Sequence, residues 1–207
     1  GGWGIYLDEG SSLIRVEQNI VYNTKSQSFH VHWGRGNVLC DNVFALSRSQ
    51  AGVIAREVHD YYVQSPAKGE LMLHNVFLTD GNHVFNDSSG FFNTGGLRSD
   101  LNLFWDLSSQ GEPLYVKQDL MPGMDAPSGE WTLAQARERG LERHSQAADP
   151  QFRDPSAGDF TVPDSSPTHE LGIQVLDTKK CGPRAVDARA PECPPSFRPA
   201  SEVVFSD

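Results

Sequence analysis

The sequence predicts an all-β chain folded as a right-handed parallel β-helix, with C-terminal coils and a cap that contains one short helix. Three short strand-like segments begin at Ile5, Phe29 and Val53, so the same pattern returns after 24 residues each time. A set of asparagines recurs beside these segments at varying intervals. Constant strands joined by loops of varying length are typical of a solenoid, because each coil contacts only its neighbours.

Alternation within the three segments predicts which side chains face the core. Residues 5–9, 29–33 and 53–57 each have apolar side chains at the first and third positions and a polar one at the fourth. This is the pattern of a strand with one buried face. The expected buried columns are Ile5/Phe29/Val53 and Leu7/Val31/Ala55, and the expected outward columns are Tyr6/His30/Ile54 and Asp8/His32/Arg56.

The asparagines predict a second ladder along the coils. Each is followed by apolar residues, and they are Asn19, Asn42, Asn75 and Asn102. We expect each asparagine to occupy the same corner of its coil in the left-handed conformation, and to bond its amide to the asparagine of the next coil.

The remaining chain divides by composition. We expect coils over residues 1–106, a helix-containing cap of the same domain over 107–178, and a Pro-rich extended tail over 179–207. Residues 131–139 predict the helix, with Thr132 as its N-cap and Gly140 at its end. The cap is expected to cover the last coil, which would otherwise expose apolar core and unpaired strand edges.

Charge and composition exclude several classes of partner. Seventeen basic and 27 acidic residues give a net charge of −10, whereas nucleic-acid binding would need a basic stripe. No apolar run approaches the roughly 18 residues of a membrane span. The chain opens on Gly1-Gly2-Trp3, which reads as the middle of a strand, so we expect an N-terminal fragment or another chain to supply upstream coils.

The cysteines predict an oxidising compartment. Cys181 and Cys193 bracket a Pro-rich segment, where a disulfide would stabilise a loop with little core of its own. Cys40 lies in an apolar strand and is expected to be a buried thiol. The predicted Cys181–Cys193 disulfide favours a secreted, extracellular or periplasmic protein.

Several segments also carry a family resemblance. They read GIYLDEGSS, VYNT, SFHVHWGRGNVLCDNVFA, NLFWD and HSQAADPQFRDPSAGDF, followed by Asp164-Ser165-Ser166-Pro167, and together cover roughly residues 3–173. In this order they resemble the right-handed β-helix proteins of the pectate-lyase-like superfamily. Within it, the chain is most similar to secreted β-helix glycoside hydrolases of the fucosidase- and xylanase-like branch. The resemblance implies a glycan substrate.

The outward columns supply the candidate site, because adjacent coils lie about 4.8 Å apart. The candidate catalytic residues are Asp8, Glu9, His30, His32, Arg56 and Glu57. The candidate substrate-binding residues are Tyr6, Trp33, Arg35 and His59. Glycoside hydrolysis needs two carboxyl groups. Asp8 is the first, and the second is Glu9, Glu57 or a residue of an upstream coil.

Three other interpretations remain open at this point. A non-catalytic structural or adhesive β-helix would assemble with another chain through an open first coil. A polysaccharide lyase would use Arg56 or His32 as its base, with Asp8 and Glu9 as Ca²⁺ ligands. In the third interpretation, the Asp8/His32/Arg56 column has only a structural role and holds the coils together. Apart from that Ca²⁺, no cofactor or metal site is expected, because His30 and His32 have few further metal-binding residues beside them.

Overall fold

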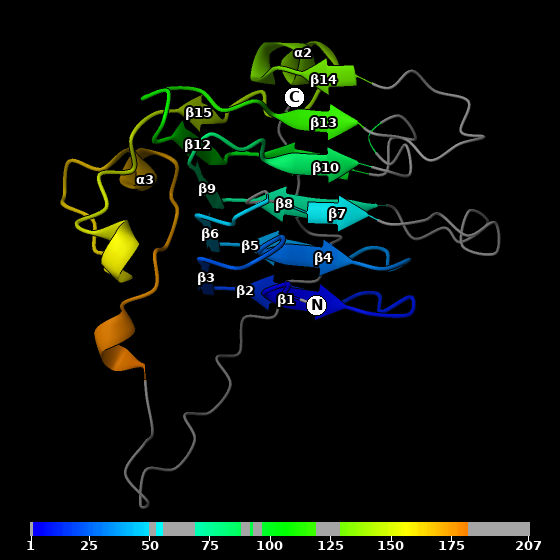
Figure 1. Cartoon of the computed structure of the whole chain (residues 1–207), viewed down its shortest axis with the longest axis horizontal. Helices are drawn as coiled ribbons and strands as arrows, with labels where there is room; N and C mark the ends of the chain where they lie inside the picture. Colours follow the sequence, from blue (N-terminus) through cyan, green and yellow to red (C-terminus); the bar gives the residue numbers. More distant parts are fainter. Residues whose placement is uncertain are drawn as a thin grey trace, which may run out of the picture. The chain divides into compact units, whose positions relative to one another are not determined.

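The computed structural model describes residues 2–49, 53–55, 69–87, 92, 97–118 and 129–181, with the backbone alone at 53–55. The chain divides into two units, Gly1–Leu176 and Asp177–Asp207. The first unit is a parallel β-solenoid of about 3 turns (Figure 1). The described part of the second unit contains one short 3₁₀ helix, η3 (Thr178–Lys180). The predicted β-helix fold is therefore confirmed.

Three sheets form the sides of the coils. The first sheet contains β1 (Ile5–Leu7), β4 (Phe29–Val31) and β7 (Val53–Ala55). The second contains β2 (Arg15–Glu17), β5 (Val38–Cys40), β8 (Glu70–Leu73) and β11 (Leu97–Asp100). The third contains β3 (Ile20–Tyr22), β6 (Val43–Ala45), β9 (Val76–Thr79), β12 (Leu103–Asp106) and β15 (Gln146–Ala147).

A fourth sheet continues the first along the solenoid. It contains β10 (Phe85–Asp87), β13 (Val116–Gln118) and β14 (Gly129–Trp131). Strand β10 lies beside β7 (Figure 1). Strand β14 pairs antiparallel with β13, whereas the pairs within the first three sheets are parallel.

The predicted 24-residue register is confirmed. Ile5 pairs with Phe29, and Phe29 pairs with Val53. Phe29 and Val31 are fully buried, whereas Ile5 and Leu7 of the first coil are only half-buried. The alternation of the sequence thus places the expected residues on the core side, and burial is deeper one coil in from β1.

One outward column differs from expectation. Tyr6 and His30 are register partners, but His30 is only 1% exposed. Its imidazole is stacked with the Tyr6 ring at 4.7 Å between centroids and lies 5.0 Å from the Trp3 ring. The prediction that His30 lies on an exposed face is therefore wrong, because neighbouring rings pack on it.

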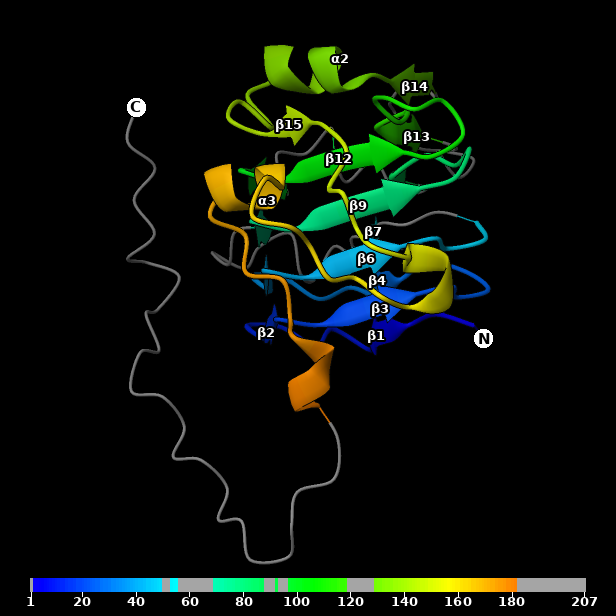
Figure 2. The same ribbon diagram turned by 90° about the vertical axis from the view of Figure 1, so that its left-hand side faces the viewer.

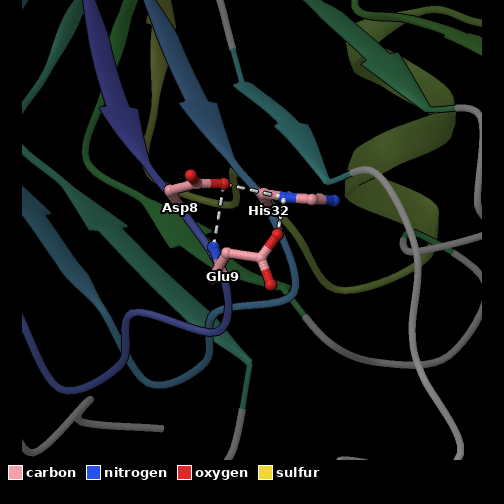
Figure 3. A group of neighbouring side chains, drawn as sticks. All are labelled: Asp8, Glu9 and His32. Carbon is pink, nitrogen blue, oxygen red and sulfur yellow. Dashed lines mark hydrogen bonds and ion pairs between the residues drawn. The ribbon is translucent and has the colours of Figure 1, made fainter.

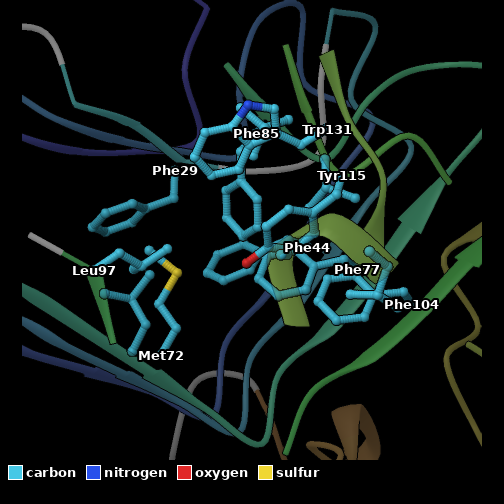
Figure 4. Close-up of a cluster of buried hydrophobic side chains, with 14 of the residues drawn as sticks. Phe29, Phe44, Met72, Phe77, Phe85, Leu97, Phe104, Tyr115 and Trp131 are labelled. Atoms are coloured by element: carbon cyan, nitrogen blue, oxygen red, sulfur yellow. The ribbon is translucent and has the colours of Figure 1, made fainter. Parts of the chain in front are cut away.

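The core contains a stack of aromatic rings from successive coils (Figure 4). Phe44, Phe77 and Phe104 come from β6, β9 and β12, with centroids 5.7 Å and then 5.2 Å apart. Leu39 and Met72 of the second sheet belong to the same buried cluster. Because identical positions of each coil supply these side chains, the packing repeats with the backbone and keeps the coils in register.

The asparagine ladder is present, with one correction. The side-chain amide of Asn19 donates to Asn42 Oδ1 at 3.0 Å, and the same bond recurs from Asn42 to Asn75 and from Asn75 to Asn102. None of the four asparagines adopts the left-handed conformation. The residue just before each one does so instead, as at Asp41, whose φ is 55°.

The cap contains the predicted helix, α2 (Leu133–Glu138). Thr132 is its N-cap and forms a capping box with Gln135, which satisfies backbone donors of the first turn. Gly140 follows with φ 85°, as expected for the end of the helix. Trp131, however, belongs to β14, and the Arg139 guanidinium lies 4.2 Å from the centre of its ring.

Residues 148–176 return along the side of the solenoid, as Figure 2 shows. This strap contains η2 (Pro155–Ala157) and α3 (Pro167–Glu170). Its buried Phe160, Leu171 and Ile173 pack on the outward side chains of the third sheet. The strap therefore gives that sheet a second buried face, a role that the sequence did not predict.

Two further expectations concern cysteines and membranes. Cys40 and Cys181 are free cysteines, so the structure does not support the predicted Cys181–Cys193 disulfide, whose second cysteine, Cys193, lies outside the described residues. Burial raises the pKa of the half-buried Cys40 thiol to about 12. No helix in the described ranges has the length and apolarity to cross a membrane.

Candidate functional site

Asp8, Glu9 and His32 form a cluster just past the ends of β1 and β4 (Figure 3). His32 Nδ1 lies 2.9 Å from Asp8 Oδ1 and 3.9 Å from Glu9 Oε1. One nitrogen or oxygen atom from each of the three side chains lies within 4.8 Å of the others. Within the described residues, this is the one group of three or more histidine, cysteine or acidic side chains with such spacing.

The backbone at Glu9 explains why two consecutive carboxylates lie together. In a continuing strand, neighbouring side chains point to opposite faces. Glu9 instead has φ 45°, and Gly10 follows with φ 79°, so the chain turns at the end of β1. Trp33, at the same position of the next coil, has φ 64°. The coil corner therefore brings the Glu9 carboxylate back beside Asp8.

The two carboxylates are open to solvent and the imidazole is less so. The side chains of Asp8 and Glu9 are 57% and 70% exposed, whereas that of His32 is 16% exposed. The hydrogen bond with His32 is the main cause that holds the pKa of Asp8 below its ordinary value, with a smaller contribution from Tyr6. Asp8 is therefore ionised at neutral pH.

Aromatic rings surround the imidazole. The Trp33 ring lies 4.0 Å from the His32 ring, and the Tyr6 ring lies 6.2 Å from it. Trp3 lies 4.9 Å from Tyr6. These half-buried rings extend the cluster along β1 toward its start, and such faces are the kind on which the apolar side of a sugar stacks.

The other predicted site residues have different positions. Arg35 is half-buried, and its backbone N–H donates to Ser12 Oγ at 3.0 Å. Its positive charge acts on Glu70, a buried residue of β8 in the second sheet. Arg56, Glu57 and His59 lie outside the described residues, so their roles stay predictions.

The sequence did not predict the charge state of Glu70. Burial raises the pKa of this fully buried carboxyl to about 7, although hydrogen bonds from Asn37 and the charge of Arg35 act in the opposite direction. The Asn37 backbone N–H donates to Glu70 Oε2 at 2.9 Å. In the sequence, Glu70 stands at the start of an apolar strand. That pattern does not show whether its side chain is buried or lies exposed at the end of the strand.

A polar hollow of about 360 Å³ lies beside the fourth sheet, away from the cluster. Its lining includes His83, Asp106, Lys117 and Glu130. Asp106 accepts hydrogen bonds from Thr79, Gly81, Ser108 and Ser109, which hold its pKa at about 2. These bonds engage both carboxylate oxygens of Asp106 in closing a turn.

Comparison with known proteins returned no match to a family model, a curated protein or a solved structure. The fold and the Asp8–Glu9–His32 cluster are therefore the basis of the functional argument.

Proposed function

We propose that this β-helix is a secreted or periplasmic carbohydrate-active protein, a glycoside hydrolase whose reaction centre is the Asp8–Glu9–His32 cluster. The observation that carries the proposal is the pair of exposed carboxylates held beside an imidazole at the coil corner. Glycoside hydrolysis requires two carboxyl groups at the scissile bond. The adjacent aromatic rings supply the apolar surface that a pyranose ring needs.

The two carboxylates would have different roles. Asp8, whose pKa is lowered, is suited to act as the ionised nucleophile or base. Glu9 would then protonate the leaving oxygen. The spacing of less than 4.8 Å between carboxylate oxygens is closer to the roughly 5–5.5 Å of retaining enzymes than to the wider pair of inverting ones. His32 would hold the Asp8 carboxylate in place.

Activity of carboxylate variants on a panel of neutral and weakly charged glycans tests this function. We expect Asp8→Asn and Glu9→Gln to lower kcat by about 10²–10⁴-fold, because each removes one proton-transferring or nucleophilic group. His144→Ala is the matched control, since His144 Nδ1 also contacts a carboxylate, Asp100 Oδ2, at 2.7 Å. Full activity of Asp8→Asn would refute the assignment, and an unsaturated product would indicate a lyase.

One observation favours a second candidate, a non-catalytic β-helix that assembles with another chain. Leu13 and Ile14, in the segment between β1 and β2, are 79% and 37% exposed. Exposed apolar side chains favour association. Self-association in sedimentation velocity, together with no product from any glycan, would support this candidate instead.

A further inference from the structure

We propose that Asp8, Glu9 and His32 bind one divalent transition-metal ion, with Zn²⁺ as the best fit. The three side chains offer one imidazole nitrogen and two carboxylate groups. Imidazole nitrogen and carboxylate oxygen are both zinc ligands, and three protein ligands leave a further coordination position for water. Metal binding itself does not depend on the proposed hydrolase activity.

The distances between the donor atoms suit a small cation. Tetrahedral ligands about 2.1 Å from Zn²⁺ lie roughly 3.4 Å from one another. His32 Nδ1 lies 2.9 Å from Asp8 Oδ1 and 3.9 Å from Glu9 Oε1, on either side of that value. The same nitrogen faces both carboxylates (Figure 3), so a cation placed among them would need only small movements of the two exposed acidic side chains.

The backbone holds the three residues in place before any ion binds. The His32 N–H donates to Leu7 O at 2.8 Å, and the Gly10 N–H donates to His32 O at 2.8 Å. The Glu9 N–H donates to Asp8 Oδ1 at 3.0 Å. These bonds tie the histidine to the turn that carries both carboxylates. Binding would therefore lose little conformational entropy from the main chain.

The donor set predicts selectivity among cations. Imidazole nitrogen is a good ligand for Zn²⁺, whereas Ca²⁺ and Mg²⁺ require several oxygen ligands. Two carboxylates and one imidazole give too few oxygens for tight Ca²⁺ binding. We therefore expect Zn²⁺ to bind more tightly than Ca²⁺ by at least about 10-fold.

A bound ion would also affect catalysis, and this step rests on the proposed hydrolase function. Coordination would engage the Asp8 and Glu9 oxygens that the reaction needs to attack and to protonate the substrate. Zn²⁺ would accordingly inhibit hydrolysis reversibly, and a chelator would restore it.

Isothermal titration of the whole chain with ZnCl₂ tests the site directly. The wild type is expected to bind Zn²⁺ at one site that His32→Ala and Glu9→Gln each weaken by at least about 10-fold, because even the loss of a residue that only orients a ligand costs that much. Glu9→Gln keeps the fold testable, since this side chain is 70% exposed. His144→Ala should bind as the wild type does, and all variants keep the same cysteines, so thiol binding cancels in the comparison.

The outcomes separate the metal site from the hydrolase. Equal Zn²⁺ affinity in the wild type and His32→Ala, or no difference between Zn²⁺ and Ca²⁺, would overturn the metal site even if glycans are cleaved. Zn²⁺ binding that depends on His32 and Glu9 would support the metal site even if no glycan is cleaved. Zn²⁺ inhibition of the wild type that persists unchanged in His32→Ala would contradict the shared site.

Discussion

At the scale of single residues, Glu70 links the stability of the fold to pH. Its pKa rises from 4.5 to about 7 on folding, chiefly because the carboxyl is buried. Between these values the folded protein keeps a proton that the unfolded chain releases. Unfolding therefore becomes easier as pH rises from 4.5 to 7, and the stability present below pH 4.5 is lost through this range.

Urea unfolding measured across this range checks the effect. We expect Glu70 to lower the free energy of unfolding by at most about 3 kcal/mol between the two pH values. Glu70→Gln should reduce that slope, because the amide does not titrate, and the buried Glu142, whose pKa is also raised by burial, would account for a slope that remains. Glu138→Gln, on the exposed face of α2, is the control and should keep the slope. An unchanged slope in Glu70→Gln would mean that the buried carboxyl does not control it.

The candidate site was only partly predictable from the sequence. The 24-residue register places Asp8 beside His32, and they are in contact at 2.9 Å. The position of the Glu9 carboxylate depends on its φ of 45°, which strand alternation does not reveal. The burial of His30 depends on how the Trp3 and Tyr6 rings pack, and that is a tertiary effect.

At the scale of structural elements, the asparagine ladder should contribute strongly to stability. Asn75 is fully buried, and its amide donates to Leu39 O and to Leu73 O, each at 3.0 Å, besides the bond to Asn102. Removing the amide leaves several buried backbone and side-chain groups without partners. Each such loss costs about 1–3 kcal/mol.

Asn75→Ala should therefore lower the free energy of unfolding by about 3 kcal/mol or more in a denaturant titration. Asn19→Ala is the comparison, because Asn19 is half-buried in the first coil and solvent replaces part of what its amide loses. We expect a clearly smaller effect there. Equal effects at the two positions would contradict a contribution that depends on burial.

The elements show where local sequence signals suffice. Thr132 and Gly140 bound a helix that the capping pattern predicts. Trp131 is expected from the sequence to lie in the same helix but belongs to β14, because Gly129–Trp131 pair antiparallel with β13. That pairing joins strands across residues 119–128, so no short-range pattern indicates it.

At the scale of the whole Gly1–Leu176 unit, the strap of residues 148–176 covers the outward face of the third sheet and buries its apolar side chains. Phe160 is 2% exposed and lies 5.2 Å from the Tyr22 ring of β3 and 5.0 Å from Phe152. A Cβ at Gly158 would lie 2.5 Å from the Tyr22 hydroxyl oxygen, so the strap approaches this strand very closely. From the sequence these residues are expected to cover the last coil instead, because nothing local distinguishes an end cap from a side cover.

Phe160→Ala should cost about 3–5 kcal/mol, since it leaves a cavity between the strap and the sheet. Faster amide hydrogen exchange in β3 and β6 of the Phe160→Ala variant would show that the stability is lost at the contact between the strap and the third sheet. Thr161→Ala changes an exposed neighbour and should leave both measurements unchanged. A loss of stability without faster exchange in these strands would mean that Phe160 acts elsewhere.

The asparagine ladder also has a direction. Every rung donates toward the C-terminal side, and the last amide, that of Asn102, donates to the fully buried carboxylate of Glu142 at 3.1 Å. An asparagine both accepts and donates along the ladder, whereas the carboxyl oxygens of Glu142 accept from Asn102, Tyr115 and Ser145 and pass no bond to a further rung. A duplicated coil carrying its own asparagine would therefore fit between any two rungs with every bond kept, but not beyond Glu142. We therefore expect duplication of coils to lengthen the solenoid on the N-terminal side of Glu142 and not beyond it.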